Sequence, residues 1–162
     1  MSRDAVIVST ARTPLTKAAR GAFNNTTGAT LGAFSIKAAV ERAGLAGAEV
    51  DDVIMGTAVQ QGSTGSNVAR LAALRAGLPV TVPAMTIDRQ CSSGLMSIAT
   101  AAKQILVDNM DICVAGGVES ISKVVGSGKM FVEPDRELLE MHPHIYMPMI
   151  GTAEVVAKRY NI

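Results

Sequence analysis

Short apolar runs alternate with segments of helical period up to about residue 115, and this alternation constrains the fold more than any other feature. Runs rich in β-branched residues predict strands at residues 5–10, 52–59, 84–87 and 111–115. Segments with an apolar residue every three or four positions predict helices at residues 30–43, 67–76 and 92–107. Alternating strands and helices predict an α/β fold, a mostly parallel sheet with helices on both faces.

Local signals refine three of these elements. The first run, Ala5–Thr10 (AVIVST), is nearly continuous in β-branched residues, as expected of a strand buried on both faces. Thr30 and Ser66 precede apolar periodic segments and are suited to cap the first two helices. A further helix is expected to begin at Thr152, close to the last residue of the chain.

The pattern changes after Ser120. Residues 121–162 mix Met, Pro and charged residues without a clean period, which indicates a loop-rich insertion or lid. The sequence therefore predicts an α/β core over residues 1–120 and the beginning of a loop-rich domain over residues 121–162. Because the last helix has no following element to pack against, the chain looks truncated.

Charge and composition argue against several classes of protein. The net charge is +1 and the basic residues are scattered, so a nucleic-acid partner is not expected. No run reaches the 18 or so apolar residues of a membrane span, and the N-terminal apolar run is too short for a signal peptide. Two cysteines make no disulfide framework, so we expect a cytoplasmic protein in a reducing compartment. His142 and His144, either side of a proline, offer too few ligands for a metal site.

One cysteine stands where the third predicted strand gives way to a helix. Cys91 lies in TIDRQCSSGLMSIATAAKQIL, immediately before or within the first turn of a helix that is apolar along one face. Free backbone N–H groups and the positive end of the helix dipole favour a thiolate there, by about 0.3–1 kcal/mol. That is too little to ionise most of a thiol at neutral pH, so a nucleophile at this position also needs a base, usually a His.

The alternative for Cys91 is a buried structural cysteine, since cysteine is among the most often buried residue types. Cys113 is the internal comparison, because it lies mid-strand between Ile112 and Val114 and is predicted to be a core residue. The loop GSTGS at residues 62–66 lacks the GK[ST] of a phosphate-binding loop, so nucleotide binding is not expected there.

Four ordered stretches resemble the thiolases, a family that comprises acetyl-CoA acetyltransferases and 3-ketoacyl-CoA thiolases. The segment around Cys91, DRQCSSGLMSI, resembles the segment that carries the family's active-site cysteine. The other three stretches are VIVSTARTP, VAGGVESIS and MIGTAEVVAKRYNI. The resemblance covers essentially the whole chain. It implies a thiolase-like layered α/β fold of two similar halves with an inserted loop domain, assembled as a homodimer or homotetramer.

The resemblance also implies roles for individual residues. Cys91 is expected to accept an acyl group from an acyl-coenzyme A substrate, with its own backbone N–H as one oxyanion donor. Met149 is expected to line the acyl and pantetheine pocket. No separate cofactor is implied, because the coenzyme A thioester is itself the substrate.

The chain also departs from the thiolase pattern. The family's activating His and second Cys belong to the C-terminal half, so this chain alone is expected to be inactive and that half is an expected partner. Asp88 stands where the family often has Asn, and Pro148 where biosynthetic members often have His.

Two other functions stay open from the sequence. A ketoacyl-synthase-type condensing enzyme shares the layered fold and a cysteine at a helix start, although its cysteine segment more often reads Thr-Ala-Cys-Ser-Ser. A non-catalytic thiolase-like module is the alternative from a different functional class. Thiol reactivity at Cys91 separates a nucleophile from a structural cysteine.

Overall fold

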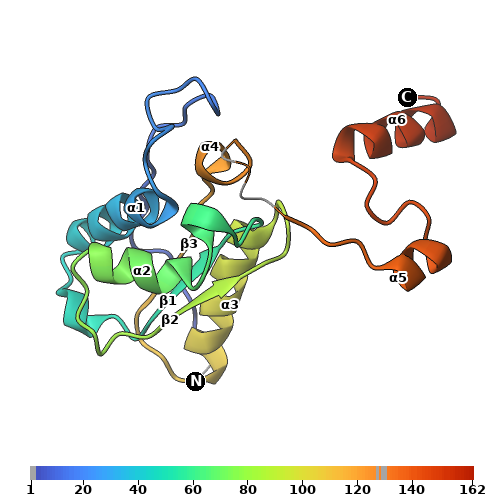
Figure 1. Cartoon of the computed structure of the whole chain (residues 1–162). Coiled ribbons are helices and arrows are strands. Elements are labelled where there is room, and N and C mark those ends of the chain that lie inside the picture. The colour runs from blue at the N-terminus through green and yellow to red at the C-terminus, as the bar shows by residue number, and fades with distance from the viewer. Residues whose placement is uncertain (1–2, 127, 129–130) are drawn as a thin grey trace. The chain divides into compact units, whose positions relative to one another are not determined.

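The computed structural model describes residues 3–126, 128 and 131–162. The described residues up to 128 belong to one compact unit, and residues 131–162 form a second. The first unit is built on a parallel sheet with strand order β2-β1-β3 (Figure 1). Its strands are β1 (Asp52–Gly56), β2 (Ala84–Ile87) and β3 (Cys113–Gly117). Its α-helices are α1 (Gly28–Arg42), α2 (Val68–Arg75), α3 (Ser93–Val107) and α4 (Ile121–Val124).

The central strand is fully buried and fixes the register of the sheet. In β1, Val53 pairs with Ala84 of β2 and with Val114 of β3. Val53 and Ile54 are both 0% exposed. Strands are confirmed in the predicted regions 52–59, 84–87 and 111–115, and with them the parallel α/β arrangement. The predicted range 84–87 matches β2, whereas β1 ends three residues before the predicted 59 and β3 lies two residues beyond the predicted 111–115.

The predicted first strand is wrong for this structure. Residues 5–10 form no strand, and the side chains of Val6, Ile7 and Val8 are 71%, 74% and 75% exposed. Among the described residues, the backbone of this segment takes part in no strand ladder, although Arg42 donates a 2.7 Å hydrogen bond to the Thr10 carbonyl. A β-branched run becomes a strand only where a neighbouring strand supplies the ladder.

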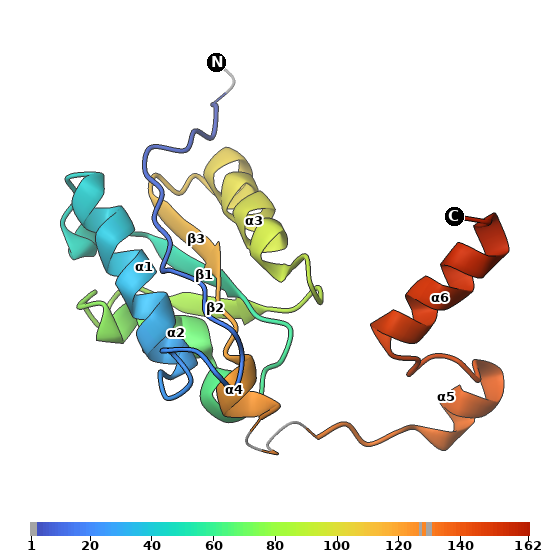
Figure 2. The same cartoon turned by 90° about the horizontal axis from the view of Figure 1, so that it is seen from above.

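Helices cover both faces of the sheet, as predicted. Figure 2 shows α1 and α2 on one side of the sheet and α3 on the other. The main hydrophobic core lies on the side of α1 and α2, where small side chains let the helices approach closely. Its buried residues are Ile36, Val40, Val50, Val53, Met55, Ala69, Ala72, Ala73, Leu78 and Val82.

Two helix caps differ from the predicted ones by one and three residues. The hydroxyl of Thr27, not that of Thr30, caps α1 by accepting from the Thr30 amide. Asn67, not Ser66, caps α2 through its Oδ1, which accepts from the Arg70 amide at 3.2 Å. The Asn67 Nδ2 group donates to the Ala84 carbonyl at 2.8 Å, a link from α2 to β2 that a hydroxyl at position 66 does not provide.

A stripe of small and polar side chains joins α3 to the sheet. Ser93, Ser97 and Ala101, spaced four residues apart, are the buried residues of α3. The Ser97 hydroxyl lies 2.6 Å from the carbonyl oxygens of both Gly94 and Gly116, so one side chain links the helix to β3. Small side chains on this face allow the helix axis to approach the sheet closely.

The larger apolar side chains of α3 point away from the sheet. Leu95, Ile98 and Leu106 are 70%, 41% and 49% exposed. The apolar face predicted for this helix is therefore present, but it is not the face that packs on the sheet of this chain. Such a wide exposed apolar face on one helix is typical of a surface that another protein layer covers.

Three glycines bring the first turn of α3 into backbone contact with the ends of β1 and β3. A Cβ atom on Gly56 would clash with the backbone of Ser93 and Gly94. A Cβ on Gly117 would lie 3.1 Å from the Gly94 Cα, which is tighter than ordinary contact. The contact therefore requires the absence of side chains, and it fixes where the start of α3 lies.

The second unit contains α5 (Arg136–Met141) and α6 (Met149–Tyr160). Asp135 caps α5, because its Oδ1 accepts from the Leu138 amide at 2.8 Å. The last helix begins at Met149 rather than Thr152, whose hydroxyl instead donates to the Pro148 carbonyl. The division into a core of residues 1–120 and a loop-rich domain of residues 121–162 stays a prediction. Within residues that the structure describes, no helix is both long and apolar enough to span a bilayer.

The glycine contact gives the first testable prediction. Replacing Gly56 by Ala should lower the free energy of unfolding by about 1–3 kcal/mol, because the added methyl group must displace backbone atoms of α3. Gly116→Ala is the matched control, because a Cβ there meets only the flexible Met55 side chain, its nearest atom 3.4 Å away. Urea unfolding followed by circular dichroism measures both variants. Equal stability of Gly56→Ala and Gly116→Ala would contradict the prediction.

Candidate active site

Cys91 lies in the turn between the end of β2 and the start of α3, and it is exposed. It borders a cavity of about 270 Å³ at the carboxyl edge of the sheet. The cavity is lined by Gly56, Thr57, Gln90, Cys91, Ser93, Gly94, Gly117, Val118 and Glu119. The three glycines of the α3 contact are therefore also walls of this cavity. Because the cysteine is exposed, the alternative of a buried structural residue does not apply to it.

Hydrogen bonds with neighbouring polar side chains hold the turn that carries Cys91. Asp88 Oδ1 accepts a 2.6 Å hydrogen bond from the Gln90 amide. The buried Ser93 hydroxyl accepts from the Arg89 amide at 2.8 Å and lies 2.6 Å from the Gln90 carbonyl oxygen. Gln90 has a φ of 50°, in the left-handed region that is uncommon for residues other than glycine. Cys91 therefore follows a backbone conformation that the surrounding hydrogen bonds hold in place.

Of the four backbone amides from Ser92 to Leu95, all in the described part of the chain, only two are free, whereas the sequence predicted free N–H groups around the sulfur. The Ser92 amide donates to the Arg89 carbonyl and the Ser93 amide to the Gln90 carbonyl, so these two groups complete the turn instead of serving the sulfur. Within the described ranges, the amides of Gly94 and Leu95 have no acceptor. These two N–H groups and the α3 dipole are what the first turn offers to a negative charge near Cys91.

A carboxylate also lines this cavity. Glu119 follows β3, and its carboxylate accepts from the Thr57 hydroxyl at 2.8 Å and from the Ala58 amide at 2.9 Å. These contacts hold the loop after β1 against the segment after β3. Sequence reasoning assigned no role to Glu119. The available signal was its position shortly after a predicted strand, four residues beyond Ala115, since the carboxyl ends of parallel strands meet at one edge of the sheet.

Cys113 lies at the opposite end of the sheet from Cys91. It is the first residue of β3 and half-buried, instead of the mid-strand core residue that the sequence predicted. Burial, followed by the nearby charges of Asp52 and Asp51, raises the pKa of its thiol to about 11. Its sulfur lies 3.7 Å from Gln104 Oε1. A protonated, half-buried thiol is a poor nucleophile, so the two cysteines have different environments.

Met149 lies outside the unit that contains Cys91. It is the first residue of α6 and 70% exposed, and its predicted role in an acyl pocket stays a prediction. His142 directly follows α5 and His144 lies in the turn after it, so both belong to the second unit. Among the residues that the structure describes, no group of three His, Cys, Asp or Glu side chains gathers as metal ligands do.

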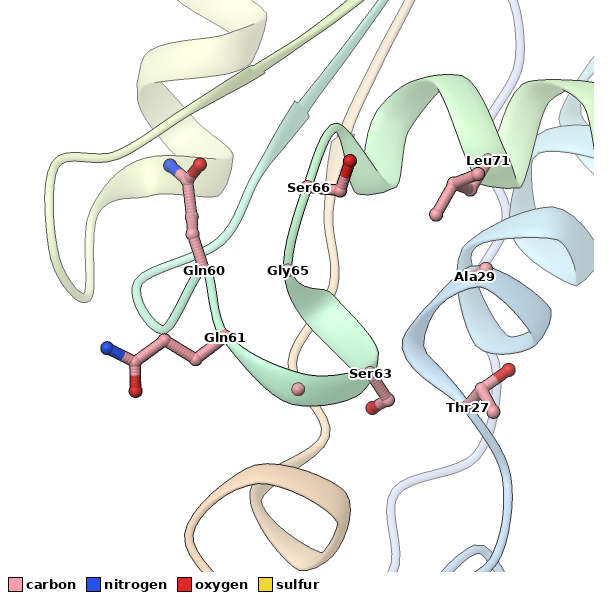
Figure 3. A pocket seen from close by; sticks show the side chains of 9 residues that line it. Thr27, Ala29, Gln60, Gln61, Ser63, Gly65, Ser66 and Leu71 are labelled. Carbon is pink, nitrogen blue, oxygen red and sulfur yellow. The ribbon is translucent and has the colours of Figure 1, made fainter. Parts of the chain in front are cut away.

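A larger and more open cavity of about 710 Å³ adjoins the GSTGS loop (Figure 3). Its lining includes Ser63 and Gly65 from this loop, and Thr27 and Leu71 from the start of α1 and from α2. Ser63 Oγ accepts from the Gly28 amide at 3.5 Å, which links the loop to α1. None of the described residues that line this cavity is a lysine or arginine, in line with the weak phosphate-loop signal in the sequence.

In a comparison with known protein families, residues 5–162 match the family model described as "Thiolase, N-terminal domain". The chain is 45% identical over 160 residues to the 3-ketoacyl-CoA thiolase of Bacillus subtilis (strain 168), covering 99% of this chain and 41% of that protein. It is 42% identical over 172 residues to an acetyl-CoA acetyltransferase of Cupriavidus necator, covering 98% of this chain and 43% of that protein.

A solved structure agrees with these sequence matches. The crystal structure of the Bacillus anthracis acetyl-CoA acetyltransferase superimposes with a TM-score of 0.81 at 36% identity, over 99% of this chain and 43% of that one. The likeness confirms the predicted layered fold. The chain spans less than half the length of each of these three relatives.

The contrast between the two cysteines is directly measurable. At about pH 8, iodoacetamide should modify Cys91 readily and Cys113 slowly, because a thiol of pKa about 11 is ionised to about one part in a thousand there. The rate at Cys113 should rise as the pH approaches 11. Peptide mass spectrometry of the wild type and of Cys91→Ser and Cys113→Ser measures each rate. Equal rates at both cysteines at about pH 8 would contradict this difference.

The backbone at Gln90 gives a third prediction. Gln90→Gly should leave the stability unchanged or raise it, because glycine adopts a positive φ without strain. The free energy of unfolding of Gln90→Val should be about 1–2 kcal/mol lower than that of Gln90→Gly, because a β-branched residue is strained in this conformation. Exposed Gln60, whose φ is not positive, is the matched control. Gln60→Gly should not be more stable than Gln60→Val. Chemical denaturation compares the four variants, and no advantage of glycine over valine at position 90 would refute the assignment.

Proposed function

Because this chain belongs to the thiolase family, we propose that Cys91 accepts an acyl group from a coenzyme A thioester. The observation that carries the proposal is the position of Cys91, exposed beside a cavity at the start of α3. The cavity of about 270 Å³ beside Cys91 gives a thin substrate arm room to reach the sulfur. The acyl-coenzyme A thioester is a substrate, and the chemistry needs no separate cofactor.

The proposed first step is a transfer of the acyl group between two sulfur atoms. The Cys91 thiolate attacks the carbonyl carbon of the thioester, and a new carbon–sulfur bond forms at Sγ. The bond between that carbon and the coenzyme A sulfur then breaks, and coenzyme A leaves as a thiolate that takes up a proton. The backbone N–H of Cys91 is one proposed donor to the oxyanion, which forms beside the positive end of α3.

The second step returns the acyl group to a coenzyme A acceptor. The carbanion of acetyl-CoA attacks the acyl-enzyme in the synthetic direction, forming a carbon–carbon bond and releasing Cys91 as a thiolate. Free coenzyme A attacks it in the degradative direction. Either direction needs a group that removes a proton from Cys91 or from the acceptor.

Within the described residues, no side chain hydrogen-bonds to Cys91 Sγ, and the Glu119 carboxylate that lines the same cavity already accepts from the Thr57 hydroxyl and the Ala58 amide. Loss of a general base costs roughly 10²–10⁴-fold in rate, so we propose that the chain alone turns over little or no substrate. A C-terminal half of the same enzyme would supply the base.

The exposed apolar surfaces of the first unit support this arrangement. Leu95 and Leu106 on α3, and Val6 to Val8 near the N-terminus, present large apolar side chains to solvent. We propose that the C-terminal half covers the exposed face of α3, that Met149 lines the acyl pocket, and that the whole enzyme forms a homodimer or homotetramer. Burial of such side chains contributes about 1.5–3 kcal/mol each, which suits a permanent contact.

Acyl capture separates the proposal from a non-catalytic module. With acetyl-CoA in excess, the chain should slowly gain one acetyl group on Cys91 and none on Cys113, detected by peptide mass spectrometry. Cys91→Ser should gain none. Steady turnover of acetoacetyl-CoA by the chain alone should be absent.

A chimaera tests whether a C-terminal half completes the proposed enzyme. Residues 1–162 joined to the remaining C-terminal part of the Bacillus subtilis relative should turn over acetoacetyl-CoA, and the same chimaera with Cys91→Ser should not. Circular dichroism confirms that both chimaeras fold. A folded chimaera that retains activity without Cys91, or a chain that acetylates at Cys113 as fast as at Cys91, would reject the proposed function.

A further inference from the structure

We propose that Asp88 is a positioning residue for Cys91, holding the turn that presents the sulfur to the thioester. The inference rests on the proposed function of Cys91 and extends it to a residue that does not touch the substrate. Asp88 acts through the backbone, because its Oδ1 accepts the Gln90 amide at 2.6 Å. The acceptor oxygen matters in this role, and the negative charge does not.

The hydrogen bond from Gln90 to Asp88 closes an Asx turn immediately before the cysteine. An Asx turn places the side chain of one residue where a backbone carbonyl would otherwise accept, two residues before the donor. Gln90 holds a φ of 50° within this turn, so a side-chain contact compensates a backbone conformation that is costly for glutamine. Without the acceptor at position 88, the backbone at Gln90 would relax and move Cys91.

A second contact connects Asp88 to the first turn of α3. The Ser93 hydroxyl lies 3.4 Å from Asp88 Oδ1 and accepts from the Arg89 amide. Ser93 is 3% exposed, and its backbone lies against Gly56 of β1. Asp88 and Ser93 therefore fix the turn at both ends, between the last residue of β2 and the glycine contact of α3.

The geometry distinguishes the role of the acceptor oxygen from that of the charge. The substitution Asp88→Asn keeps an oxygen at the same place for the Gln90 amide and removes the charge. The substitution Asp88→Glu keeps the charge, but the extra methylene group moves the carboxylate away from the short Asx turn. The two variants therefore give opposite results for a geometric role and for an electrostatic role.

The experiment compares Asp88→Asn, Asp88→Glu and Asp88→Ala with the wild type in the 162-residue chain. The acetylation rate of Cys91 by acetyl-CoA should fall about tenfold or more in Asp88→Ala and Asp88→Glu, and stay within about threefold in Asp88→Asn. Hydrogen exchange at the Gln90 amide should accelerate in Asp88→Ala and Asp88→Glu only. Asp108→Ala, an exposed aspartate at the other end of α3, is the matched control and should change neither rate.

The outcomes separate this inference from the proposed function. If the wild type acquires no acetyl group on Cys91, the proposed function fails and the inference fails with it. If the wild type is acetylated and Asp88→Ala matches it, the inference alone is wrong. If Asp88→Glu is normal and Asp88→Asn is impaired, the charge and not the turn is responsible, which also overturns it. Should Asp88→Ala fail to fold, as seen by circular dichroism, the other two variants still decide between these results.

Discussion

The first turn of α3 lies against the backbone of β1 and β3 with no side chain between them, and the rest of the site depends on this contact. Gly56 and Gly117 leave room for Ser93 and Gly94, and the Ser97 hydroxyl links the helix to Gly116. Protein interiors are close-packed, so a contact of this kind permits few displacements. The start of α3, and the turn before it, are therefore fixed relative to the carboxyl edge of the sheet.

The same contact explains why the two cysteines differ. Cys91 lies in the exposed turn after β2, beside the cavity that the glycines border. Cys113 begins β3 at the other end of the sheet, where burial and two aspartates raise the pKa of its thiol and keep it protonated. A strand–helix junction exposes a thiol to open space and helix amides, whereas a strand position places it between packed layers.

The exposed apolar side chains follow from how α3 uses its faces. The helix packs its small stripe on the sheet, because only small side chains permit the close approach that the glycines allow. Its large side chains, such as Leu95, must then point outward. The chain spans less than half of its relatives, and this outward face is where we propose that the remaining half packs.

Local pattern in the sequence correctly predicted three of the four strands it indicated and the three longer helices of the first unit. It also predicted the location of Cys91 at a strand–helix junction. These follow from side-chain periodicity and from residues within one turn of each other. Only the tertiary structure decided that residues 5–10 lack a strand partner, that α3 packs by its small face, and that Glu119 binds Thr57, 62 residues away. Each of these depends on which distant backbone lies nearby, and no local period encodes that.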